Sequence, residues 1–333
     1  MSILAIEIHD TGLRVMEQHS NTLLPFDLGK PLSPGFALNE GRETSIGHMA
    51  AKQASIQPLH INNRFWDQLS TEGAGELAFE HLSYLWQQVH AGVESVLFAV
   101  PSHMTPHELG ILYGICKELH LPVKSFVASP ITMTTSGVHL DIMLHRSTMT
   151  LIQHGDLSLS HSEPSIGWLA LQRQWAKGIQ NEFVRATRFD PMHSAESEQG
   201  LADSLPLLLE NLNTMDTTEM NLGGYTIHIT QGMMSEWAHS LIAKWCAATH
   251  GVLEQNPVEG EKPIILSSSA SQIPGLRRVL EKQLNTTVQT STHSDVLRNL
   301  FTVWPAQLEE PLSGQVTYQT ALIAPKDGEA TNI

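Results

Sequence analysis

Basic side chains are scarce in this chain, which has 19 lysine and arginine residues against 34 aspartate and glutamate residues in a total of 333. The net charge of −15 opposes binding to a nucleic acid, because the phosphate backbone is held by basic residues. Long apolar runs are missing too, since none approaches the roughly 20 residues of a membrane-spanning helix. MSILAIEIHD at the start lacks the basic flank of a signal peptide. We therefore expect a cytoplasmic protein without a nucleic-acid partner and without membrane insertion.

Cysteine is nearly absent, and no local motif indicates a metal site or a hydrolytic triad. Cys116 and Cys246 both lie in apolar helical patterns, where a thiol behaves as a small hydrophobe, so no structural disulfide is expected. His103 and His107 have the spacing of two ligands on one helical face, but no third ligand is indicated. Scattered surface histidines are the favoured interpretation. The GxSxG motif of many serine hydrolases does not occur.

The first part of the chain alternates strand and helix patterns. ILAIEI (3–8) and LRVM (13–16) flank HDTG, which predicts two strands joined by a tight turn. VESVLFAVP (93–101) predicts a strand that ends at proline, and Thr105-Pro106 begins a helix that ends at Leu121-Pro122. VKSFVAS then returns as a strand. This order is typical of an α/β fold with a parallel or mixed sheet.

The second part repeats this alternation with other pieces. Residues 139–153 predict a hairpin with its turn at His145 to Ser147, and GDLSLS adds a strand. A helix is predicted over 166–185, a loop over 188–200, a strand pair around GGYTIHI, one helix through SEWAHSLIAKWCAATH and a last helix from Ile273-Pro274. The tryptophans in these patterns, at 168, 175, 237 and 245, are expected to lie mostly in the core. The length and the hydrophobic content of 41% indicate two domains or lobes.

Serines stand where a ligand-binding turn usually has glycine in ILSSSASQIPGL (265–276). Glycine permits positive φ and lets backbone N–H groups approach a phosphate or a purine, whereas serine permits neither freely. A serine hydroxyl can instead cap a helix. We therefore expect Ser269 and Ser271 to act as caps before the last predicted helix.

Taken in order, the segments resemble the nucleotide-binding domain of DnaK-type heat-shock chaperones, within the actin and sugar-kinase superfamily. The resemblance spans most of the chain, and its main pieces are residues 46–70, 100–130, 223–237 and 265–276. It implies a two-lobed actin-like ATPase fold of the α/β class, with ribonuclease H-like sheets and flanking helices. The first lobe would be 1–137 plus about 311–325, the second lobe 138–310 and a disordered tail 326–333. We expect no counterpart of the family's peptide-binding domain, because the sequence ends soon after the expected last helix.

The positions that match the family's first phosphate turn and its catalytic groups are altered. The family has an aspartate at the end of the first strand and then a glycine, whereas this chain has Glu7, His9, Asp10 and Thr11 there. Asp10 would repel terminal phosphates, since like charges at short range in a partly buried cleft are costly. The remaining altered counterparts are Gln68 for the catalytic lysine and Ser129 for the glutamate that precedes proline.

The second phosphate turn and the adenosine turn depart further from the family. Where the family has aspartate, leucine, three glycines and threonine, this chain has MLHRST (143–148), and a later aspartate is replaced. Magnesium takes oxygen ligands, which a methionine thioether cannot supply. His145-Arg146 is interpreted as a surface pair at a hairpin tip rather than an anion site. The altered positions of the second phosphate turn and its strand are Met143, His145, Arg146, Ser147 and Thr150, whereas Thr148 fits the pattern; Ser268 and Ser269 stand in place of the paired glycines of the adenosine turn.

Three functions fit this pattern. The favoured one is a catalytically inert relative of the ATPase domain, without a cofactor, that serves as a scaffold or regulator for an unidentified protein partner, because the groups for metal, phosphate and water positioning are all replaced. The second is a divergent protein that binds ATP or ADP with magnesium, in which Glu7, Asp10 and Arg146 replace the family's residues. The third is an actin-like scaffold that recruits the cytoplasmic tail of a membrane protein.

Overall fold

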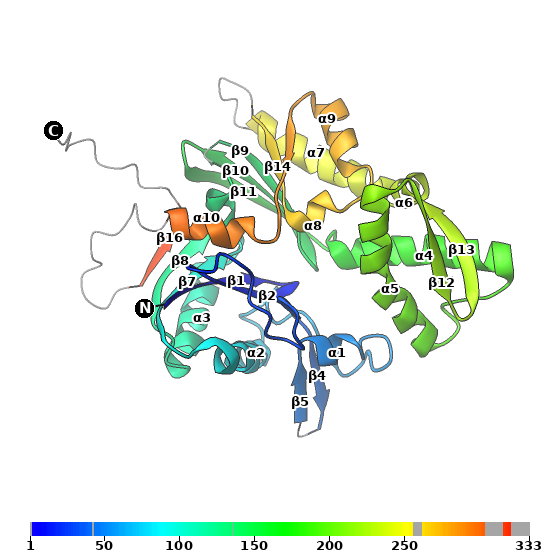
Figure 1. The fold of residues 1–333 in the computed structure, drawn as a ribbon. Coiled ribbons are helices and arrows are strands. Elements are labelled where there is room, and N and C mark those ends of the chain that lie inside the picture. Colours follow the sequence, from blue (N-terminus) through cyan, green and yellow to red (C-terminus); the bar gives the residue numbers. More distant parts are fainter. Residues whose placement is uncertain (1, 42, 135, 256–261, 304–315, 321–333) are drawn as a thin grey trace.

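The computed structural model describes residues 2–41, 43–134, 136–255, 262–303 and 316–320. It is a mixed α/β arrangement in which helices flank several sheets (Figure 1). The expected α/β class is therefore confirmed. The expected disordered tail 326–333 lies outside the described residues.

The two larger sheets have the same topology. Each contains three consecutive antiparallel strands, and later strands extend the sheet in parallel from the first of the three, with three such strands in the first sheet and two in the second. The first sheet has the order β16-β8-β7-β1-β2-β3, and the second has the order β11-β10-β9-β14-β15. The strands of the first sheet are β1 (Ser2–His9), β2 (Gly12–Glu17), β3 (Leu32–Pro34), β7 (Val93–Val100), β8 (Val123–Ala128) and β16 (Thr317–Gln319). Those of the second are β9 (Gly137–Ile142), β10 (Arg146–Gln153), β11 (Asp156–Pro164), β14 (Ile264–Leu266) and β15 (Val288–Thr290).

Two small sheets and the helices complete the fold. The small sheets are β5-β4-β6, with β4 (Ala37–Glu40), β5 (Glu43–Ile46) and β6 (Ile61–Asn62), and the hairpin of β12 (Thr217–Leu222) and β13 (Tyr225–Thr230). Residues 35–92, between β3 and β7, form an insertion in the first sheet. The helices that lie in this insertion or follow strands of the first sheet are α1 (His48–Ala51), α2 (Ala74–Val89), α3 (Pro106–Glu118) and the 3-10 turn η1 (Ser129–Thr132). The others are α4 (Trp168–Thr187), α5 (Ala195–Thr214), α6 (Gln231–Trp237), α7 (His239–Gln255), α8 (Ser268–Ser271), α9 (Leu276–Leu284) and α10 (Asp295–Val303).

The side chains of β1 and β9 point alternately to the two faces of their sheets, and the two faces pack against different helices. Leu4, Ile6 and Ile8 of β1 pack into one core with α2 and α3, while Ala5 joins a second cluster with α10 on the other face. In the second sheet the even-numbered residues of β9, such as Leu140, pack with α4, α5, α7 and α9. Because successive strand residues point to opposite faces, the remaining residues of β1 and β9 are free to form a polar site.

The predicted helices of the second part needed three corrections. The expected loop 188–200 ends early, because Ser194 and Ser197 form a capping box that begins α5 at Ala195. The single helix expected through residues 235–250 is two helices, α6 and α7, with Ala238 between them. The helix near Ile273-Pro274 is not the last one, since β15 and α10 follow α9. The predicted hairpin was placed correctly, but its turn is at residues 143–145 rather than 145–147.

The C-terminal elements return to the first sheet. Strand β16 pairs in parallel with β8, within the stretch of about 311–325 that was expected to belong to the first lobe. Helix α10 contacts β1, β7 and η1, although the expected boundary at residue 310 placed it in the second lobe. Both cysteines are buried and free. No helix within the described ranges combines the length and the apolar character needed to cross a bilayer.

Candidate functional site

The turns of two hairpins, one from each large sheet, meet at a single carboxylate. Asp10, in the β1–β2 turn, is 1% exposed, and its Oδ1 accepts a hydrogen bond of 2.7 Å from the backbone N–H of Leu144. Its Oδ2 accepts a second bond, of 2.9 Å, from the N–H of His145 in the β9–β10 turn. The turn that carries Asp10 requires Gly12, whose φ is 142° and whose missing Cβ would overlap the carbonyl of Ser33. Asp10 therefore occupies the position in which these N–H groups would hold an external anion.

The carbonyl groups of the β9–β10 turn are satisfied by the beginning of α4. Trp168 N donates to the carbonyl of Met143 at 2.7 Å, and Leu169 N donates to that of Leu144 at 3.0 Å. The backbone of the turn is thus bonded on both sides, by α4 and by Asp10, which satisfies buried groups that would otherwise be costly. A phosphate could reach the N–H groups of Leu144 and His145 only by displacing Asp10.

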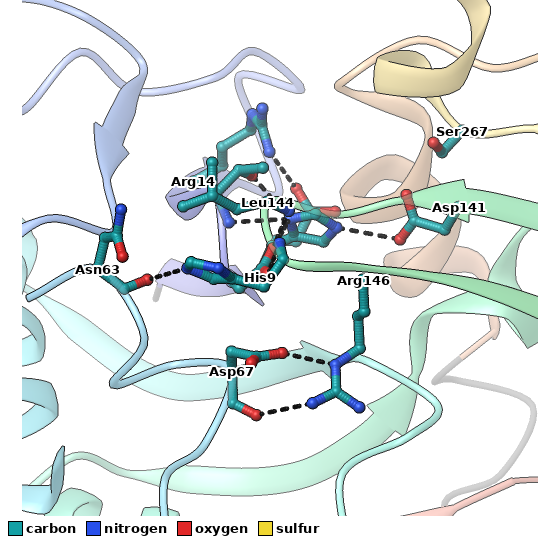
Figure 2. Close-up of polar contacts among 12 residues, drawn as sticks. His9, Arg14, Asn63, Asp67, Asp141, Leu144, Arg146 and Ser267 are labelled. Carbon is teal, nitrogen blue, oxygen red and sulfur yellow. Dashed lines mark hydrogen bonds and ion pairs between the residues drawn. The ribbon is translucent and has the colours of Figure 1, made fainter. Parts of the chain in front are cut away.

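A second contact between the sheets joins His9 of β1 to Asp141 of β9 (Figure 2). His9 Nε2 lies 3.0 Å from Asp141 Oδ2, and His9 Nδ1 lies 2.7 Å from Thr11 Oγ1. Burial alone lowers the pKa of His9, but the charge of Asp141, the hydrogen bond to it and the charges of Asp10 and Glu7 raise the pKa to about 9. Burial alone raises the pKa of Asp141, yet protonated His9 holds it well below its usual range. The two side chains therefore form a buried ion pair at neutral pH.

Burial also raises the pKa of Asp10, and protonated His9 together with the N–H groups of Leu144 and His145 opposes that rise. The carboxylate thus depends on these three neighbours for its charged form. Because all of them come from the two turns and from the end of β1, charge and backbone geometry stabilise the same junction.

A narrow cavity lies beside this pair, between β1 and α8. Glu7, which pairs with Arg14 across β1 and β2 at 3.1 Å, lines it together with Asp141 and His139. The cavity leaves about 30 Å³ for the centres of water molecules, where one water needs roughly 10–15 Å³. Small-molecule sites usually have about 300–1,000 Å³. The cavity is therefore far smaller than a typical small-molecule site.

The third contact corrects the interpretation of His145-Arg146 as a surface pair. His145 is 6% exposed, and its Nε2 lies 2.8 Å from the carbonyl oxygen of Asn63. Arg146 donates from Nε to Oδ1 of the buried Asp67 at 2.5 Å and from a second nitrogen to the carbonyl oxygen of Asp67 (Figure 2). The pair lies at the junction of the two sheets because the hairpin tip is covered by residues 63–67. Both side chains are engaged within the chain, which leaves neither free to bind an added anion.

The structure brings together some of the residues singled out in the sequence and separates others. Glu7, His9, Ser129, Ser268 and Ser269 line the same cavity, and Met143 is buried in the turn that Asp10 contacts. The side chains of Gln68, Ser147, Thr148 and Thr150 lie apart from it: Thr150 bonds to Ser102, Ser147 is buried without a partner for its hydroxyl, and Gln68 contributes backbone hydrogen bonds.

The serine turn is also organised differently from the expectation. The cap of the short helix α8 is Ser267, whose hydroxyl accepts from Ala270 N at 3.2 Å. Ser271, which was expected to cap, donates its hydroxyl to the carbonyl of Ser268 instead. The prediction of capping by Ser269 and Ser271 was therefore wrong by two to four positions, because α8 begins earlier than the turn was expected to end.

Three polar residues of the junction were missed in the sequence: Arg14, Asp67 and Asp141. Asp141 had a detectable signal, since HLDI alternates and puts His139 and Asp141 on the face opposite Leu140 and Ile142. Arg14 had a similar signal as a charge inside the apolar run LRVM, directly across from Glu7. Asp67 had none, because its partner Arg146 is 79 residues away.

The histidine pair proposed as a possible metal site is not assembled. His103 precedes α3, which begins at Pro106, so the two imidazoles do not share a helical face. His103 is also half-buried, and its desolvation lowers its pKa to about 4. Among the residues that the structure describes, no group of three or more histidine, cysteine, aspartate or glutamate side chains has a metal-binding arrangement.

Comparison with known proteins adds no family assignment. The chain matches no protein-family model, and no curated protein is significantly similar to it in sequence.

Proposed function

We propose that this protein is a catalytically inert relative of the DnaK-type ATPase domain, with the two-lobed actin-like fold, that acts as a scaffold or regulator for a protein partner. The shared topology of the two large sheets supports this fold, because an internally repeated sheet of this order is what the family resemblance implies. The places that the resemblance assigns to phosphate are the β1–β2 and β9–β10 turns. In this chain these turns bind each other.

The observation that carries the proposal is the double hydrogen bond from Leu144 and His145 to Asp10. Backbone N–H groups in a turn bind phosphate through their dipoles, and a buried carboxylate satisfies the same donors. The carboxylate of Asp10 is part of the chain and is therefore always present at the site. An external phosphate would have to displace this carboxylate, and the two negative charges would then repel each other. Loss of nucleotide binding is the expected consequence.

The polar contacts between the sheets also favour a fixed arrangement over a catalytic cycle of opening and closing. His9 binds Asp141, and Arg146 binds Asp67. Away from this junction, the side chain of Gln199 in α5 accepts a hydrogen bond of 2.8 Å from the backbone N–H of Ser55. Each contact joins residues that are at least 79 positions apart in the chain. We infer that the protein presents a constant surface to its partner, in the cytoplasm, without using a cofactor.

A thermal-shift titration with ATP and ADP, with and without magnesium, tests the loss of nucleotide binding. A ligand at a hundredfold excess over its dissociation constant stabilises the folded state by about 2.7 kcal/mol. We expect millimolar nucleotide to leave the unfolding midpoint unchanged relative to the same ionic strength of sodium chloride. A magnesium-dependent rise would contradict the proposal and favour a divergent ATP- or ADP-binding protein.

A further inference from the structure

A second, much larger hollow lies between the first-sheet insertion and helices α4 and α5. It offers about 710 Å³ and is lined on one side by residues 51–63 and on the other by α4 and α5. We call it the α4–α5 groove. Its floor is largely apolar, with Leu169, Ala176, Leu201 and Leu205 among the lining side chains. Its size is within the range of sites that bind ligands or peptide side chains.

Helix α4 presents a regular stripe to this groove. Leu169, Gln172, Arg173, Ala176, Lys177 and Gln180 recur at helical spacing, while Leu171, Trp175 and Ile179 point into the core. Arg173 and Lys177 are exposed and one helical turn apart, and neither forms an ion pair with a described residue. The Nε of Arg173 bonds only to the carbonyl of Leu169 in its own helix.

Helix α5 contributes the acidic side of the same groove. Asp203 accepts a hydrogen bond of 2.9 Å from Gln199, whereas Glu198 has no ion-pair partner among the described residues. The charges of the groove are therefore segregated, with two free cations on α4. In a chain of net charge −15, this stripe is an electrostatically distinct place for a carboxylate.

The chain segment 51–63, which contributes one wall of the groove, also exposes large apolar side chains. Leu59 is 95% exposed and Ile56 is 39% exposed, and both belong to the segment that forms one wall. Exposed apolar side chains beside a groove with an apolar floor and charged walls are typical of surfaces that bind proteins. No described residue of this chain covers Leu59.

We propose that the α4–α5 groove binds a short segment of a partner protein that presents a large apolar side chain next to a carboxylate. The apolar side chain packs on the apolar floor of the groove, and the carboxylate pairs with Arg173 and Lys177. The inference rests on the proposed scaffold function and names the surface that the partner uses.

The test uses a displayed library of random 12-residue peptides selected on the full-length protein, with the enriched peptides then synthesised and measured by fluorescence anisotropy. We expect the enriched sequences to share an aspartate or glutamate within four positions of a leucine, phenylalanine, tryptophan or isoleucine. Reversing both α4 charges, Arg173→Glu with Lys177→Glu, should weaken their affinity tenfold or more. Replacing the peptide's carboxylate residue with lysine should restore affinity for the reversed variant.

A matched control carries Lys244→Glu with Lys282→Glu, two exposed lysines on α7 and α9 outside the groove. This variant has the same number of reversed charges, so a general electrostatic effect would weaken binding equally in both. Equal weakening, or the failure of any peptide to be enriched, would overturn the proposal. Displacement of the peptides by micromolar decanoate would overturn it too, because the occupant would then be a small apolar carboxylate. The nucleotide titration is independent, so a protein that binds ATP and these peptides fails only the first proposal.

Discussion

Replacing Asp10 with alanine is expected to lower the free energy of unfolding by about 2–4 kcal/mol. The substitution removes the acceptor of two buried N–H groups, those of Leu144 and His145. Leaving a buried donor without a partner costs about 1–3 kcal/mol each. Relief of the desolvation that raises the pKa of Asp10 offsets part of this loss.

Urea unfolding of the wild type and of Asp10→Ala measures this effect. Asp156→Ala is the matched control, because Asp156 is an exposed aspartate next to a hairpin turn and its removal changes the net charge equally. We expect the control to stay within about 0.5 kcal/mol of the wild type. An equal effect of the two substitutions would show that the carboxylate of Asp10 does not hold the turns together.

The second large effect concerns the ion pair of His9 and Asp141. Its contribution depends on pH because the pKa of His9 rises from 6.5 in the unfolded chain to about 9 in the folded one. A group with a raised folded-state pKa contributes its full stability below the unfolded pKa and loses it as the pH rises through the folded pKa. A rise of this size corresponds to about 3 kcal/mol. The stabilisation should therefore be nearly complete at pH 6.5 and almost lost by about pH 9.5.

Asp141→Asn removes the charge that contributes most to the raised pKa of His9, and it keeps the size of the side chain and an acceptor for His9. We expect the variant to be about 3 kcal/mol less stable than the wild type at pH 6.5 and nearly equal to it at pH 9.5. Taking the difference between the two proteins at each pH cancels the titration of the shared cysteines and tyrosines. A difference that stays constant from pH 6.5 to 9.5 would contradict the ion pair.

Local sequence patterns were sufficient for most of the elements near the site. The strands β1, β2, β7 and β8 follow from apolar runs that end at a turn or a proline, and α3 follows from the capping box at Thr105. These features depend on residues within a few positions of each other, so periodicity and capping rules apply directly. The split between α6 and α7 was missed, because the apolar helical pattern continues across Ala238.

The contacts that close the site could not be derived from local patterns. Asp10 was expected to repel a phosphate, which is a statement about charge alone, but its role is set by the N–H groups of a turn 134 residues away. The interpretation of His145-Arg146 as a surface pair failed for the same reason, since a hairpin tip is exposed only if nothing covers it. Residues 63–67 cover the hairpin tip in this protein, and no local pattern in their sequence predicts that contact.

The contacts of the two turns explain why the replacements in these turns occur together. A turn of glycines leaves its N–H groups open to a ligand, whereas in this chain the buried side chains of Met143, Leu144 and His145 fill the surroundings of the turn. Asp10 then satisfies the donors that no ligand reaches. We infer that loss of the glycines and gain of Asp10 stabilise the same closed junction.

Chemical rescue with formate is the most direct test of the claim that Asp10 fills an anion site with the chain's own carboxylate. Formate has the size of the group that Asp10→Ala removes, so it can bind Leu144 N and His145 N in its place. We expect sodium formate, compared with equal sodium chloride, to raise the unfolding midpoint of Asp10→Ala well above any change in the wild type and in Asp156→Ala. Equal responses of the three proteins would contradict the claim, because the two N–H groups would then have no affinity for a carboxylate.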